Sequence, residues 1–214
     1  MNVRVLLTRP EHDDTTFYLS QWSREAIALA KEKGMDVLDL NRERANRKEV
    51  EGVLDKISPD VVVFNGHGSE DMVTGHKNEP LIIAGENEGL LRSKLVYAIS
   101  CRSAKTLGPE SIKAGAVAYT GYDDDFIFVT ETEKVARPLE DETAELFLSP
   151  SNSFIKSLLK GNSVGESHKR AENAFRENIL KIAGSDNPDI NLIKFLVWDM
   201  RHFVSQKHGR ENIN

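Results

Sequence analysis

The stretch that decides the fold is residues 61–68, VVVFNGHG, in which a short apolar run ends in a histidine flanked by glycines. Residues 95–102, LVYAISCR, repeat this layout, and the apolar run there ends at Cys101, the single cysteine of the chain. Apolar runs of this length are typical of strands that are buried on both faces of a parallel sheet. Because the carboxyl ends of parallel strands meet at one edge, we expect His67 and Cys101 to emerge there together.

The first half of the chain alternates between strand and helix patterns. Such alternation is typical of parallel βαβ units and predicts an α/β fold with a mainly parallel sheet. The further elements expected here are strands over residues 3–8, 36–40 and 116–120, helices over 20–33, 46–57, 88–92 and 109–114, and a small hairpin or excursion over 69–84.

The second half of the chain is expected to be mostly helical. Ser149-Pro150 should break one helical stretch into two, whereas Ser163 and Glu166 have the spacing of a capping box at the start of a long helix. No linker-like stretch divides the sequence, so residues 1–214 are expected to form a single domain. The expected elements are helices over 139–148, 152–160 and 163–182, a helical or mixed segment over 190–200, and a last strand over 202–205.

Composition excludes several classes of protein. The net charge of −6 and the scattered Lys and Arg residues argue against binding to nucleic acid. No segment has the length and hydropathy of a membrane span, and one cysteine cannot form an internal disulfide, so we expect a soluble cytoplasmic protein. The oligomeric state is left open by the sequence.

A cysteine and a histidine at one sheet edge suggest nucleophilic catalysis. The imidazole of His67 could take the proton of the Cys101 thiol, and the backbone N–H groups of Gly68 and Cys101 could stabilise an oxyanion. The alternative is structural, because a lone cysteine is often a small core residue and Gly-His-Gly can be an ordinary tight turn. His76 is a competing base and is expected on a surface turn.

Three short motifs carry a resemblance to a known group of enzymes: residues 64–69 (FNGHGS), 98–103 (AISCRS) and 115–121 (GAVAYTG), with the histidine ahead of the cysteine. In these the chain resembles the caspase-like cysteine peptidases, and within them the gingipain, clostripain and CHAT-type branches more than true caspases. The resemblance implies a three-layer α/β/α sandwich and peptide-bond hydrolysis by a His67/Cys101 dyad. It implies a peptide or protein substrate and no cofactor.

Four aspartates are candidates for substrate binding. The loop after the first strand contributes to the specificity pocket in the group, and here it carries Asp13 and Asp14, while Asp123 and Asp125 follow the strand over 116–120. Carboxylates in a pocket favour Arg or Lys before the scissile bond. Exposed loop aspartates are also common without such a role, and Asp13 could simply cap a helix. Ile99 stands where some basic-specific relatives carry an acidic residue, which is a departure from their pattern.

Other functions stay open. A caspase-like domain can lack activity and serve as a binding or signalling module. A flavodoxin-like binder of small molecules is disfavoured, because no glycine-rich phosphate loop follows the first strand. The acidic loop 123–125 lacks the spaced ligands of a calcium loop, so no metal is expected either.

Overall fold

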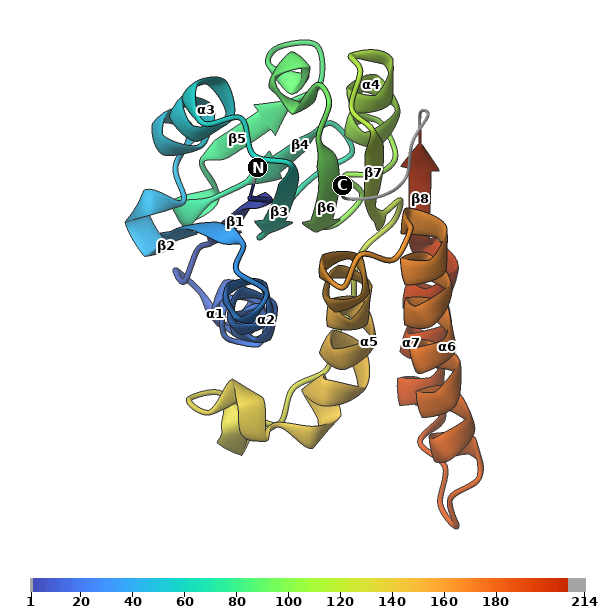
Figure 1. Cartoon of the computed structure of the whole chain (residues 1–214). Coiled ribbons are helices and arrows are strands. Elements are labelled where there is room, and N and C mark those ends of the chain that lie inside the picture. The colour runs from blue at the N-terminus through green and yellow to red at the C-terminus, as the bar shows by residue number, and fades with distance from the viewer. Residues whose placement is uncertain (1, 208–214) are drawn as a thin grey trace.

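The computed structural model describes residues 2–207, and a six-stranded sheet runs through the centre of the molecule (Figure 1). The strand order is β2-β1-β3-β6-β7-β8, and every pair is parallel except β7 with β8. The strands are β1 (Arg4–Arg9), β2 (Asp36–Asn41), β3 (Val61–Asn65), β6 (Leu95–Ile99), β7 (Ala118–Tyr122) and β8 (Phe203–Lys207).

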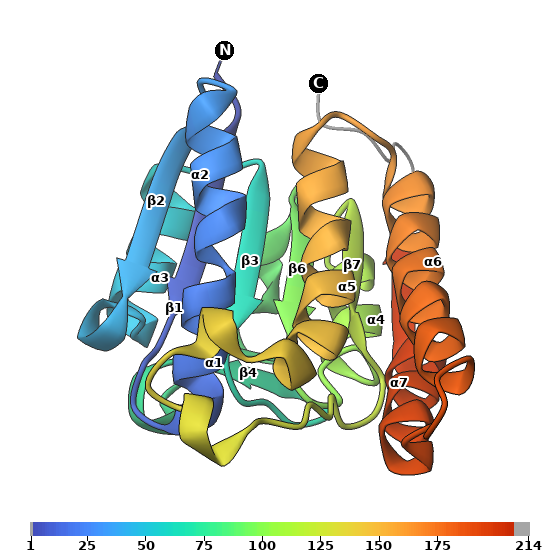
Figure 2. The same ribbon diagram turned by 90° about the horizontal axis from the view of Figure 1, so that it is seen from below.

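Helices cover both faces of the sheet and complete a three-layer sandwich (Figure 2). On one face lie α1 (Asp14–Trp22), α2 (Arg24–Glu32), α5 (Glu142–Leu159), α6 (Val164–Ala183) and α7 (Ile190–His202). On the other lie α3 (Arg47–Lys56), α4 (Leu107–Lys113) and the antiparallel hairpin of β4 (Met72–Thr74) and β5 (Pro80–Ile83). Single 3-10 turns occupy Arg42–Arg44, His76–Asn78, Glu88–Leu91, Thr132–Lys134 and Pro138–Glu140.

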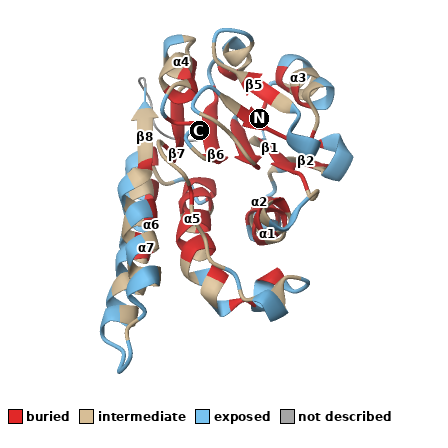
Figure 3. Ribbon diagram, turned by 180° about the vertical axis from the view of Figure 1, so that it is seen from behind, coloured by how far each residue is buried: buried red, intermediate tan, exposed pale blue. Residues whose placement is uncertain are grey.

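The apolar strands hold the layers together because their side chains alternate between two cores. In β3, Val61 and Val63 join the core under α1, α2 and α5, whereas Val62 and Phe64 join the core under α3 and α4. Figure 3 shows the central strands as buried along most of their length. Burial of both faces explains why residues 61–64 are apolar throughout and do not alternate with polar residues.

The predicted helix over residues 20–33 is two helices. Asp13 caps α1 with its carboxylate, so helical structure begins at Asp14, and the chain turns at Ser23 before α2 begins. The two residues expected in a loop, Asp13 and Asp14, therefore lie at a helix start. The option that Asp13 caps a helix is confirmed.

The predicted break at Pro150 is wrong, because α5 continues through it. Proline has no N–H to donate to the carbonyl four residues earlier, which normally interrupts a helix. Here Asn178 of α6 donates its side-chain N–H to the carbonyl of Leu146 at 2.7 Å and satisfies that acceptor. The hydrogen bond that Pro150 cannot make is supplied by a neighbouring helix.

The short helix expected over residues 88–92 is a single 3-10 turn, Glu88–Leu91. The other helices follow the sequence closely. The capping box of Ser163 and Glu166 is confirmed at the start of α6, and the segment described above as helical or mixed is the helix α7. The last strand, β8, pairs antiparallel with β7. Within the described range, no helix combines the length and hydropathy that crossing a membrane requires.

Candidate active site at the carboxyl edge of the sheet

The loops after β3 and β6 lie against each other at the carboxyl edge of the sheet. Asn65 is paired with Ile99 at the end of the ladder, so His67 and Cys101 each come two residues beyond it. The hydroxyl of Ser100 donates to the carbonyls of Gly66 and His67, both at 2.8 Å. The structure thus brings the backbones of His67 and Cys101 together, as the sequence predicts.

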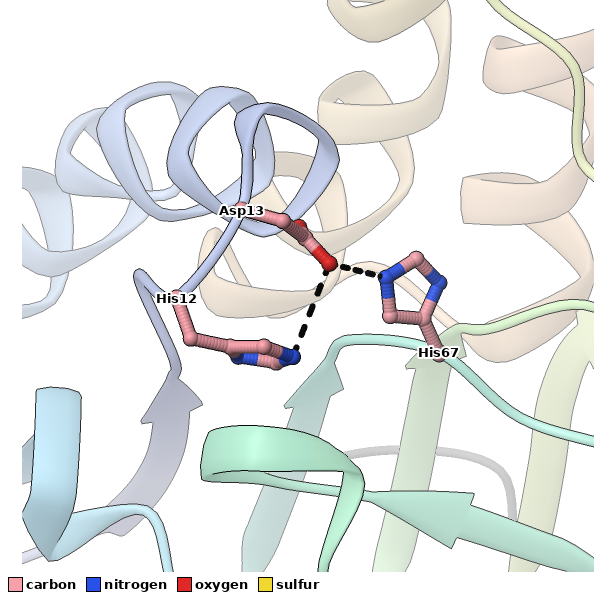
Figure 4. Close-up of side chains that lie close together, drawn as sticks. All are labelled: His12, Asp13 and His67. Atoms are coloured by element: carbon pink, nitrogen blue, oxygen red, sulfur yellow. Dashed lines mark hydrogen bonds and ion pairs between the residues drawn. The ribbon is translucent and has the colours of Figure 1, made fainter.

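The imidazole of His67 is oriented by a carboxylate. Its Nε2 atom lies 2.7 Å from Oδ2 of Asp13 (Figure 4). Its Nδ1 atom makes no hydrogen bond with any residue between 2 and 207. About a third of the side chain is exposed. One ring nitrogen is therefore held in place, and the other is available to a reacting group.

Asp13 serves two elements at once. Its Oδ1 accepts the backbone N–H of Thr16 at 2.8 Å, which caps α1 and leaves Oδ2 for His67. Partial burial on its own would raise the pKa of Asp13, but the hydrogen bonds from Thr16 and His67 outweigh it and hold the pKa below its ordinary value. Asp13 is therefore an anion at neutral pH, which suits a group that stabilises an imidazolium.

Cys101 lies partly buried at the start of the turn after β6. Its thiol packs against the core and lies 3.8 Å from the carbonyl of Phe126, to which it donates, and it makes no hydrogen bond with His67 among the described residues. Burial raises the pKa of the Cys101 thiol, and the negative charge of Asp125 adds to this effect. The thiol therefore rests in its protonated form and needs a base before it can act as a nucleophile.

Two backbone N–H groups in the loops after β3 and β6 have no acceptor among the described residues. Neither the amide of Gly68 nor that of Cys101 donates a hydrogen bond to a residue that the structure describes. A Cβ atom added at Gly68 would lie 2.9 Å from the carbonyl oxygen of Met72 and 3.1 Å from that of Cys101. Only glycine lets the two loops approach this closely.

The candidate substrate-binding aspartates differ in their surroundings. Asp123 lies 2.8 Å from Nδ1 of His202, and Asp125 forms a two-point ion pair with Arg102 at 2.8 and 2.6 Å. Asp13 is engaged by His67, as described above. Asp14 is exposed and makes no hydrogen bond or ion pair with any described residue. Of the four carboxylates, Asp14 alone is free to receive a cationic group in this conformation of residues 2–207.

Asp14 belongs to an acidic hollow beside the His67–Asp13 pair. The hollow has a volume of about 680 Å³. Glu11 within it is compensated by Arg42 at 2.8 Å, so the free negative charge comes mainly from Asp14 and Glu43. Its lining residues are Glu11, His12, Asp13, Asp14, Phe17, Arg42, Glu43, His76, Val135 and Ala136.

Two further residues of interest are not among the candidates from the sequence. His12 lies in the same group as Asp13 and His67, with its ring packed edge-on against those of His67 and His76. It follows β1 at the same sheet edge, so the rule that found His67 could have found it. Asp199 of α7 is buried, and burial raises its pKa well above the ordinary value. The sequence signal that could have identified Asp199 is the presence of an aspartate inside the mainly apolar stretch of residues 192–200.

The comparisons with known proteins bear on the fold. No family model matches the sequence, and the comparison with curated proteins gives no match. A similar solved structure is the complex of Porphyromonas gingivalis RgpB pro- and mature domains, with a TM-score of 0.60 and 9% sequence identity over 96% of this chain and 47% of that chain. This chain therefore spans about half the length of its match. The predicted fold class, a caspase-like three-layer α/β/α sandwich with a mainly parallel sheet, is confirmed.

Proposed function

We propose that the protein is a cysteine endopeptidase in which Cys101 is the nucleophile, His67 the general base and Asp13 the group that orients His67. The observation that carries the proposal is the 2.7 Å contact between His67 Nε2 and Asp13 Oδ2. It lies at the edge of the sheet where Cys101 follows β6, next to the end of β3. A histidine that is fixed by a carboxylate through one ring nitrogen can accept the proton of a cysteine thiol through the other, once the thiol reaches it. The cysteine-peptidase-like fold supports this assignment.

The proposed reaction begins with rotation of the Cys101 side chain from the Phe126 carbonyl toward Nδ1 of His67. His67 takes the thiol proton as sulfur attacks the substrate carbonyl, and Asp13 stabilises the imidazolium that forms. The N–H groups of Gly68 and Cys101 receive the oxyanion. The C–N bond then breaks, His67 passes its proton to the leaving amine, and water activated by His67 hydrolyses the thioester.

We further propose that the substrate carries Arg or Lys before the scissile bond. Asp14, a free carboxylate of the acidic hollow, is the group that receives the cationic side chain. Asp123 and Asp125, although engaged by His202 and Arg102, add negative potential on the β7 side of Cys101. Charge-assisted hydrogen bonds to carboxylates are among the stronger polar contacts in proteins.

Hydrolysis of fluorogenic peptides that differ in the residue before the cut tests the proposal. The wild-type protein should cleave Arg and Lys peptides faster than Leu or Asp peptides, and Cys101→Ala and His67→Gln should abolish cleavage. Wild-type rates equal to those of Cys101→Ala on every peptide would overturn the enzymatic assignment.

A second candidate function, an inactive module that binds peptides, is favoured by the resting position of Cys101. Its thiol donates to Phe126 and has a raised pKa, as expected of a structural cysteine. The two functions differ in how the thiol reacts with a peptide that carries an electrophilic ketone after Arg. An enzyme should be labelled at Cys101 much faster by this probe than by iodoacetamide, and labelling should need His67. A module should bind the peptide without this acceleration.

A further inference from the structure

Beside the proposed dyad, three potential metal ligands lie close together. His12 and His67 both direct Nε2 toward Oδ2 of Asp13, at 3.5 and 2.7 Å (Figure 4). The three ligand atoms all lie within 4.8 Å of one another. We propose that His12, Asp13 and His67 form a binding site for a divalent transition-metal ion such as Zn²⁺, and that the ion switches the dyad off.

The distances from Asp13 to the two imidazoles suit such an ion after small movements. Zinc bonds of about 2.0–2.1 Å in tetrahedral geometry separate neighbouring ligand atoms by roughly 3.4 Å. The His12–Asp13 separation of 3.5 Å already has this value, and the 2.7 Å contact of His67 must open by less than about 1 Å. Two imidazoles with one carboxylate favour zinc and its neighbours over Mg²⁺ and Ca²⁺, which prefer oxygen ligands.

The hydrogen bonding of His12 is incomplete among the described residues. Its side chain is 11% exposed, and its Nδ1 is buried without a partner in the described chain. Its Nε2 lies 3.3 Å from Oδ1 of Asn78 as well as 3.5 Å from Asp13. A neutral imidazole has one N–H group. With the proton on Nε2, the ring donates to Asn78 or Asp13 and Nδ1 keeps a buried lone pair without a donor. With the proton on Nδ1, the Nε2 lone pair faces two oxygens, and a metal ion between them would accept all three donors.

The surroundings hold the ligands in place and attract cations. The ring of His76 packs edge-on against His12 at a centroid distance of 5.5 Å, and the Thr16 amide fixes the Asp13 carboxylate. The acidic hollow that includes Asp14 and Glu43 opens at the same point. Asn78 could supply a further oxygen to the ion. These residues lie outside the acidic loop 123–125, on which the expectation of no metal is based.

The effect on activity rests on the proposed function. The ion would occupy the Nε2 lone pair of His67, so in the neutral ring the proton must reside on Nδ1. No lone pair then remains to accept the proton of Cys101, and Asp13 no longer compensates an imidazolium. Zinc bound at Nε2 is therefore an inhibitor even though it does not touch the sulfur.

Zinc affinity measured on untagged protein by competition with a chromogenic chelator tests the site. Wild type and Cys101→Ala should bind one Zn²⁺ equally well, because the site does not use the thiol. His12→Gln and His67→Gln should bind at least about tenfold more weakly. His202→Gln is the matched control, since His202 pairs with Asp123 at 2.8 Å but belongs to no described group of three potential metal ligands. Each variant is first compared with wild type by circular dichroism and by melting temperature without metal.

The outcomes separate this proposal from the proposed function. Loss of zinc binding in Cys101→Ala with retention in His12→Gln would place the ion between thiol and imidazole and overturn the site, as would equal affinity in all variants. If His12→Gln misfolds, two other measurements decide. They are the zinc affinity of His67→Gln and the d–d absorption of Co²⁺ bound to Cys101→Ala. If the protein binds zinc but has no peptidase activity, the metal site stands and the proposed function is wrong. If it has peptidase activity that zinc does not inhibit, only the proposed inhibition by zinc is wrong.

Discussion

The Nε2 atom of His67 lies 2.7 Å from Oδ2 of Asp13 across a separation of 54 positions in the sequence. The contact forms because the same carboxylate caps α1, which fixes Asp13 at the carboxyl edge of β1, next to β3 in the sheet. A structural role and the proposed catalytic role therefore share one side chain, through different oxygens.

Substitutions at Asp13 should separate these two roles. Asp13→Asn keeps a good N-cap, so the melting temperature should change little, but it removes the charge that stabilises the His67 imidazolium. We expect kcat/KM to fall by about 10²- to 10⁴-fold. Asp13→Ala should in addition lower the free energy of unfolding by about 1 kcal/mol. Equal activity of Asp13→Asn and wild type would remove Asp13 from the mechanism.

Asp14 offers a test of specificity. Asp14→Asn should raise KM for Arg and Lys peptides about tenfold or more, because a charge-assisted hydrogen bond contributes roughly 1.5–3 kcal/mol. Peptides with an uncharged residue before the cut should be unaffected. Asp55→Asn, at an exposed position in α3, is the control. Parallel losses on charged and uncharged peptides would show that Asp14 does not select the substrate.

The close approach of Gly68 to Cys101 predicts that the loop tolerates no side chain. Gly68→Ala places a Cβ atom 2.9 Å from the Met72 carbonyl oxygen, so the backbone must shift and carry the Gly68 amide with it. We expect lower stability and a loss of about 10²-fold in kcat, the usual effect of losing one oxyanion donor. Gly52→Ala in α3, with nothing within 4 Å of its added Cβ, should leave activity intact and raise stability slightly. Wild-type kcat in Gly68→Ala would exclude this amide from the oxyanion site.

Asp199 predicts a pH dependence of stability. Burial raises its pKa in the folded state, so its proton favours folding most below the unfolded pKa of about 3.9, and this contribution is lost as the pH rises through the folded pKa. Asp199→Asn cannot ionise. Its free energy of unfolding relative to wild type should therefore be constant at low pH and should increase as the pH rises from about 4. Urea melts between pH 3 and 8, with Asp55→Asn as the exposed control, measure this difference. A constant difference across the range would contradict the prediction.

Local pattern predicts much of this molecule. The apolar runs of β3 and β6 and the parallel topology suffice to bring His67 and Cys101 to one edge. The partner of His67 is not predictable in this way, because Asp13 serves equally well as a cap, a pocket residue or a base partner, and a long-range contact decides among them. The same holds for the resting Cys101, since its neighbour Phe126 comes from a loop without a periodic pattern.

The continuous helix α5 gives the last prediction, because its wrongly predicted break has a specific cause. Asn178→Ala removes the donor to the Leu146 carbonyl and should lower the free energy of unfolding by about 1 kcal/mol. In a Pro150→Ala background the backbone N–H of residue 150 can donate to Leu146 instead, so the same substitution should cost much less. Urea melts of wild type, the two single variants and the double variant form a thermodynamic cycle that measures the coupling. A coupling energy of zero would mean that Asn178 does not compensate for Pro150, and that packing of α5 on the sheet alone carries the helix through the proline.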